Sequence, residues 1–350
     1  MTEAEFYCII LFREGESDMK RVLPFKLTDY LFTYNYGVQY YGVLLNNPQG
    51  VKQLYNQYII PYLYDDGSYQ EMNYYFLNDD TPVELDPNHG LSPIFQEQVS
   101  LNKEELPSNE YKEMFIDRVK SAIDSNFYFV GWWDEYFIPG TVYYKNERFS
   151  HDYCIIGYDE SHFYGAGYYS GYPKVIPITY NDFFEANMAL PIDHAFLWKL
   201  NHDYIFNLDL PLIYRGLESY LSGLVPNTEK RDYSLHVFGK NVLIKLSEII
   251  ERDNRVDIRF VHTLKQHKLL MKERIEYIYN LYEIPKGTEI ETLYSLDIKI
   301  QQVFNMCLKL RITRSNRTGM MIAQSLKEIV SEEERVYPVI MQKILSAKTM

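Results

Sequence analysis

The stretch GWWDEYFIPGTVYYKNERFSHDYCIIGYDE contains the residues best suited to acid–base chemistry. Asp134 and Glu135 close one aromatic, β-branched run, and His151 opens the next apolar run. If 127–133 and 151–158 are adjacent antiparallel strands, the end of the first and the start of the second share one edge of the sheet. A carboxylate at that edge would orient the imidazole and stabilise its protonated form, as a general base in acyl transfer requires.

The two acids and the histidine also fit a purely structural interpretation. In that case Asp134 and Glu135 form a solvated strand end, and His151 is a turn residue. Of the acids that follow the histidine, Asp152 should point to the opposite face of the strand, and Asp159 lies at the tip of a predicted hairpin. Asp134 and Glu135 are therefore the preferred partners of His151.

Other polar residues form weaker patterns. His262 and His267 are five positions apart on a predicted helix, whereas two ligands on one helical face would be four apart. His202 and Asp203 fit a turn cap. The run FYGAGYYSG lacks the G-x-G-x-x-G order, and no helix follows its glycines. The sequence therefore predicts no metal site and no cofactor.

The chain has three cysteines, Cys8, Cys154 and Cys307, which are far apart and follow no disulfide or zinc-binding pattern. Each lies within an apolar run, which favours a buried thiol. Cys154 comes three residues after His151 on one predicted strand, so the two side chains should point to opposite faces.

Composition narrows the class of protein. The chain has 350 residues and a net charge of −13, which disfavours nucleic acid as a general partner. No apolar run reaches the roughly 18–20 residues that a membrane span needs. The N-terminal run carries acids where a signal peptide would carry basic residues. We therefore expect a cytoplasmic protein.

The pattern of the chain changes near residue 200. Short strand-like runs broken by Gly, Pro and Asn-Asp turns precede that point, and long helical periods follow it. We therefore predict an α/β lobe over 1–200 and an α-helical lobe over 201–350. The predicted elements are a strand over 6–12, helices over 50–60 and 108–126, strands over 127–133 and 151–158, a hairpin return to 169, a helix capped by Thr179, and helices over 242–250, 257–284, 289–312 and 318–344.

Three successive segments carry a family resemblance: WWDEYFIPGTVYY, HDYCIIGYDE and IPITYNDFFEA. The helical runs VFGKNVLIKLSEII and VDIRFVHTLKQHKLLMKERIEYI follow them. As a set they resemble the family of butirosin biosynthesis protein H and its N-terminal domain, which is related to papain-like and C39-type cysteine peptidases. The resemblance covers most of residues 20–345. Members are found in nonribosomal peptide and antibiotic biosynthesis clusters.

The resemblance implies an α+β fold, with a papain-like, C39-related lobe built on an antiparallel sheet and an α-helical lobe. It also implies acyl transfer from a carrier-protein thioester to an amine through an acyl-cysteine, with His151 in the place of the family histidine. The family cysteine opens a helix near the N-terminus, but the corresponding segment 23–45 has no cysteine. Cys8 is the only cysteine upstream and is the remaining candidate nucleophile.

Two functions follow from these residues. In the first, His151 acts as general base for an amine acceptor, with Asp134 orienting it, and Trp133, Tyr136 and Tyr164 contribute to the substrate site.

In the second function, the chain is a catalytically inactive papain-like module that binds a carrier protein or a synthetase partner. A carrier would need a local basic patch on this acidic protein, and the run KQHKLLMKER over 265–274 is the predicted patch.

Overall fold

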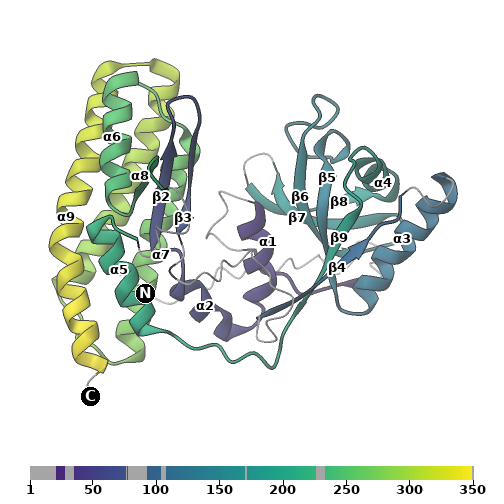
Figure 1. The fold of residues 1–350 in the computed structure, drawn as a ribbon, viewed down its shortest axis with the longest axis horizontal. Helices are drawn as coiled ribbons and strands as arrows, with labels where there is room; N and C mark the ends of the chain where they lie inside the picture. Colours follow the sequence, from purple (N-terminus) through teal and green to yellow (C-terminus); the bar gives the residue numbers. More distant parts are fainter. Residues whose placement is uncertain are drawn as a thin grey trace, which may run out of the picture. The chain divides into compact units, whose positions relative to one another are not determined.

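The computed structural model describes residues 21–27, 35–75, 77, 93–103, 108–169, 172–225 and 233–348. The protein has an α+β fold with antiparallel sheets, as predicted (Figure 1). Its contacts divide the chain into two compact units. The first unit spans 1–51 and 85–206, and the second spans 52–84 and 207–350. The predicted boundary at residue 200 lies close to the observed one at 206, but the second unit also includes the segment 52–84.

A seven-stranded sheet forms the centre of the first unit. Its order is β4-β9-β5-β6-β7-β8, β1 pairs with the far end of β6, and all neighbouring strands are antiparallel. The strands are β1 (Arg21–Val22), β4 (Ile94–Ser100), β5 (Tyr128–Asp134), β6 (Ser150–Tyr158), β7 (His162–Tyr169), β8 (Tyr172–Thr179) and β9 (His194–Leu200). The predicted strand at 127–133 and the hairpin from 151 to 169 are confirmed.

Helices cover both faces of this sheet. They are α1 (Asn35–Leu44), α3 (Ser108–Asp124) and α4 (Tyr180–Met188), and short 3₁₀ turns occur at η1 (Pro48–Gly50) and η2 (Glu135–Phe137). Phe115 of α3 and Phe183 of α4 pack on the face that carries Trp133, with the Trp133 and Phe183 rings stacked at 4.9 Å. Tyr40 of α1 packs against Trp198, which projects from the other face.

The predicted cap of α4 is confirmed. The Thr179 side chain accepts a hydrogen bond from the Asp182 backbone N–H at 3.0 Å, which satisfies one of the open donors of the first helical turn.

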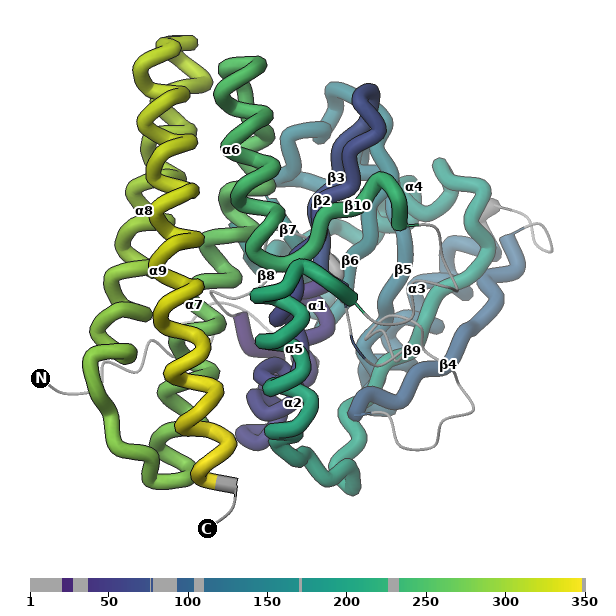
Figure 2. Tube along the Cα trace, turned by 60° about the vertical axis from the view of Figure 1, so that its left-hand side comes forward, coloured from purple at the N-terminus to yellow at the C-terminus, as the bar shows by residue number. Residues whose placement is uncertain are grey.

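The second unit combines long helices with a three-stranded antiparallel sheet of order β10-β2-β3. In Figure 2, α6, α7, α8 and α9 run side by side, and their apolar faces form one core. The elements are α2 (Val51–Asn56), β2 (Ile60–Asp65), β3 (Gln70–Tyr75), α5 (Leu210–Ser222), β10 (His236–Phe238), α6 (Asn241–Asp253), α7 (Ile258–Leu281), α8 (Thr288–Thr313) and α9 (Asn316–Lys348).

One predicted helix is shorter than expected. The helical pattern before Pro61 ends at Asn56, and β2 begins at Ile60 and pairs with β3. The apolar residues Ile59 and Ile60 continue the helical spacing, but they are β-branched and suit a buried strand equally well. The predicted strand at 6–12 lies outside the described residues.

Candidate active site

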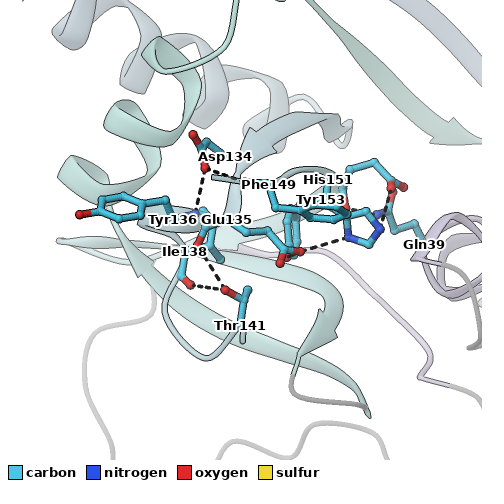
Figure 3. Close-up of polar contacts among 10 residues, drawn as sticks. Gln39, Asp134, Glu135, Tyr136, Ile138, Thr141, Phe149, His151 and Tyr153 are labelled. Atoms are coloured by element: carbon cyan, nitrogen blue, oxygen red, sulfur yellow. Dashed lines mark hydrogen bonds and ion pairs between the residues drawn. The ribbon is translucent and has the colours of Figure 1, made fainter. Parts of the chain in front are cut away.

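The structure brings Glu135 and His151 together at one edge of the large sheet. His151 lies opposite Trp133 in the register of β5 and β6, and β5 passes directly into η2, which begins with Glu135. This turn places Glu135 Oε1 3.1 Å from His151 Nδ1 (Figure 3). The Glu135 side chain is 5 % exposed and the imidazole is 32 % exposed, so the ring is held from the interior and reached from outside.

A third residue fixes the carboxylate. The Tyr153 hydroxyl donates a hydrogen bond to Glu135 Oε1, the oxygen that also faces His151. Tyr153 is fully buried, and burial is the main reason why its pKa is raised. The phenol therefore stays protonated and acts as a permanent donor that orients Glu135.

The surroundings of His151 stabilise its charged form. Burial by itself lowers the pKa of His151, but the Glu135 hydrogen bond and the charges of Asp152 and Glu135 outweigh burial and raise the pKa above its ordinary value. Because the Glu135 oxygen faces Nδ1 as a hydrogen-bond acceptor, the neutral ring donates its Nδ1–H to Glu135, and Nε2 is the basic nitrogen.

Asp134, the other predicted partner, is oriented away from the histidine. Its carboxylate accepts hydrogen bonds from the Tyr136 backbone N–H at 3.0 Å and from Arg148 at 2.7 Å. These bonds cap η2 and fasten the loop that returns to β6. The sequence analysis gave the orienting role to Asp134, but the structure places Glu135 beside His151 instead.

Asp152 and Gln39 lie on the other side of His151. Asp152 Oδ1 is 3.9 Å from His151 Nε2, and the Gln39 amide of α1 donates to the Asp152 backbone oxygen at 2.9 Å (Figure 3). Burial raises the pKa of Asp152. The sequence analysis missed Gln39. The available signal was one amide side chain within the apolar and aromatic run GVQYYGVLL.

The three predicted substrate residues have different surroundings. Trp133 is 1 % exposed and packs in the core. Tyr136 is half-buried and stacks beneath Arg148, with 4.9 Å from the guanidinium to the ring centre. Tyr164 is buried, and its hydroxyl donates to Asp159 at the far end of β6 from His151. Tyr136 is the nearest of the three in sequence to Glu135, and Figure 3 shows its ring pointing away from His151.

The described cysteines do not meet His151 as a nucleophile would. Cys154 is fully buried and faces the opposite side of β6, as predicted, and burial raises the pKa of its thiol. Cys307 is buried in α8, and burial raises its pKa to about 12. Cys8 lies outside the described residues.

The second unit contains a buried polar cluster of another kind. Lys268 Nζ lies 2.5 Å from Glu333 Oε1 and also donates to the Tyr220 hydroxyl and to His267 Nδ1. His267 Nε2 bonds to the Ile59 backbone oxygen at 3.0 Å. All of these side chains are buried, and each of the three N–H donors of the Lys268 ammonium group has a partner. The cluster is therefore a satisfied core network.

This cluster also corrects the predicted basic patch over 265–274. Lys268 and Arg274 are buried, and Lys272 pairs with Asp297 at 2.6 Å. The apolar stripe of α7 is wide enough to carry these cations into the core, where their polar ends meet carbonyl and carboxylate oxygens. This run is not an exposed basic surface.

Comparisons with protein-family models and with curated protein sequences find no match for this chain. Within the described residues, no helix combines the length and apolar character needed to cross a membrane. The same part of the chain contains no group of three or more His, Cys, Asp or Glu side chains placed to hold a metal ion.

Proposed function

We propose that this protein is an acyltransferase of the papain-like type, which moves an acyl group from a carrier-protein thioester to an amine. The proposal depends above all on the pair formed by His151 and Glu135. A buried carboxylate fixes one ring nitrogen at 3.1 Å, while the partly exposed ring leaves its other nitrogen as the base. The antiparallel sheet with α1 on one face agrees with the papain-like fold that the sequence resemblance implies.

The chemistry can proceed without an acyl-cysteine. The acceptor nitrogen attacks the thioester carbonyl carbon while His151 Nε2 takes its proton, the carbon–sulfur bond breaks, and the leaving thiolate receives the proton from the imidazolium. Holding the two reactants together supplies much of the rate. Because the carrier and the amine are both intracellular substrates in such a pathway, we propose the cytoplasm as the location.

The second candidate function is a catalytically inactive module that binds a carrier protein or a synthetase partner. One observation favours it. The helix that would carry the family cysteine presents Gln39, which donates to the Asp152 backbone oxygen, and the nearby Cys154 thiol is buried.

The test is intact-protein mass spectrometry and product analysis with a panel of acyl thioesters, with and without amines. We expect amide product with the wild-type protein and a loss of about 10²–10⁴-fold in rate for His151→Ala. His162→Ala is the matched control, because this partly exposed histidine lies at the opposite end of the hairpin. A covalent acyl adduct that disappears in Cys8→Ser would instead establish an acyl-cysteine. Equal rates for His151→Ala and the control would refute the proposed base.

A further inference from the structure

The helix α8 carries a second regular stripe of side chains besides the one that it buries. Its buried residues recur between Ile290 and Leu310, and the helix packs against α7 and α9 (Figure 2). Ile298 is 59 % exposed and Ile312 is 84 % exposed. They belong to a set of exposed or partly exposed residues that we refer to as the outer stripe: Tyr294, Ile298, Gln301, Asn305, Leu308 and Ile312.

The outer stripe has the spacing of coiled-coil contact positions. Its members follow one another at alternating steps of four and three residues, so they lie along one side of the helix. In the heptad notation, Ile298, Asn305 and Ile312 occupy position a. Tyr294, Gln301 and Leu308 occupy position d. A helix face that meets only water is ordinarily polar, whereas this one is apolar at both ends, so it is typical of a helix that pairs with another helix.

The outer stripe is complementary to itself when a second copy is turned end for end. A two-fold axis at position 303 places Ile298 opposite the partner's Leu308 and Tyr294 opposite the partner's Ile312. The same axis places Gln301 opposite the partner's Asn305. Each apolar residue thus meets an apolar residue, and each amide meets an amide that can donate and accept hydrogen bonds. Within one chain the Gln301 amide already donates to Asn305 at 3.3 Å.

Exposed charges beside the outer stripe favour this antiparallel orientation. Glu291 lies near the start of α8, and Lys309, Arg311 and Arg314 lie at its end. Antiparallel pairing brings Glu291 of each copy to the cationic end of the other. Parallel pairing would instead place the cations of the two copies beside one another, and their repulsion would oppose association.

We propose that the outer stripe joins two copies of this chain as an antiparallel pair of α8 helices. Both copies use the same surface, so the contact closes as a dimer and does not extend into a filament. The central amides fix the register at some cost in stability. A shift by one heptad would place Gln301 and Asn305 against apolar side chains and leave them without partners. This dimer does not depend on the acyl-transfer function.

Sedimentation of the full-length protein over a range of concentrations tests the dimer. We expect reversible dimerisation of the wild type and a dissociation constant at least about 10-fold higher for Ile298→Glu, because the change brings a charge into the apolar contact. Ile205→Glu is the matched control and should dimerise like the wild type, because Ile205 is also an exposed isoleucine but lies outside α8. Circular dichroism establishes that both variants are folded.

Two results of the sedimentation experiment would overturn the proposal. A wild-type protein that stays monomeric at every concentration would leave the outer stripe to a segment of the same chain or to another protein. Equal dissociation constants for the wild type and folded Ile298→Glu would place the dimer contact elsewhere.

Oxidative cross-linking tests the orientation of the two helices. Ile298→Cys and Leu308→Cys are prepared separately, each with Cys8→Ser, while the native Cys154 and Cys307 are buried. We expect a covalent dimer only when the two variants are mixed, since Ile298 lies opposite the partner's Leu308. A covalent dimer formed by either variant alone would show parallel pairing and contradict the proposed orientation.

Discussion

At the scale of single residues, the environment of His151 is set by one turn. β5 ends at Asp134 and η2 begins at the next residue, so two neighbouring acids leave the backbone in different directions. Asp134 turns back onto the cap of η2 and Arg148, while Glu135 reaches His151 and receives the Tyr153 hydroxyl. Asp134 thus has a structural role, and Glu135 belongs to the candidate active site.

This division predicts different effects on the pKa of His151. Glu135→Gln removes a hydrogen-bonded negative charge that favours the imidazolium, so the pKa of His151 should fall. Since the base must be neutral, the rise of the acyl-transfer rate with pH should also move to lower pH. The measurement is an NMR titration of the labelled imidazole together with the pH–rate profile.

Asp134→Asn is the matched control for that titration, because it changes the neighbouring acid that bonds to Arg148. We expect the His151 titration to stay where it is in this variant. A larger shift in Asp134→Asn than in Glu135→Gln would contradict the assignment of the two acids.

At the scale of elements, the buried network of Lys268 joins several helices of the second unit. Lys268 belongs to α7, Glu333 to α9 and Tyr220 to α5, and their contacts are between 2.5 and 2.8 Å. A buried ion pair adds little net stability compared with apolar packing, but removing one partner leaves an uncompensated charge. The network therefore selects one arrangement of these helices more than it strengthens the unit.

The stability of two variants tests this interpretation. Lys268→Met should lower the free energy of unfolding by about 3–5 kcal/mol, because it leaves the Glu333 carboxylate buried without a cation. Adding Glu333→Gln should recover part of that loss. Urea unfolding measures both, and purely additive losses would show that the pair is not coupled.

An exposed ion pair between α6 and α9 provides the comparison for the buried one. Lys327 lies 2.7 Å from Glu251, and both side chains are 43 % exposed. Lys327→Met should change the free energy of unfolding by less than about 1 kcal/mol, since water screens this pair.

At the scale of the whole molecule, the second unit is built from two separate parts of the chain. The segment 52–84 supplies β2 and β3, and β10 pairs with β2. Backbone oxygens of Tyr55 and Gln57 also accept hydrogen bonds from the buried Arg274 guanidinium. The helices from α5 to α9 therefore depend on a segment that lies between β1 and β4 of the first unit's sheet in sequence.

This dependence predicts the behaviour of fragments. Residues 207–348 alone should unfold at lower urea concentration and with less cooperativity than the same residues joined to 52–75 through a flexible linker. Without 52–75, Arg274 and His267 lose the carbonyl partners that satisfy them in the core. Circular dichroism during urea unfolding provides the measurement. Equal urea midpoints of unfolding for the two fragments would show that residues 52–75 do not stabilise the helices.

The sequence by itself determined only those regular elements that have a strong local pattern. Helical periods fixed α3 and the long helices after residue 240, and alternation with a turn signal fixed the β6–β7 hairpin. The start of α4 could be predicted from Thr179, because an N-cap involves residues that are only three positions apart. These features are local, so a short window of sequence contains their cause. The pairing of a histidine with a strand-end acid was also within reach of local reasoning.

Only the tertiary structure decided which side chains meet. The direction of Glu135 depends on η2, the position of Gln39 depends on how α1 packs on the sheet, and the burial of Lys268 depends on helices far apart in sequence. The membership of 52–84 in the second unit likewise rests on long-range strand pairing. Such contacts depend on how the complete core packs. No single segment of the sequence therefore predicts them.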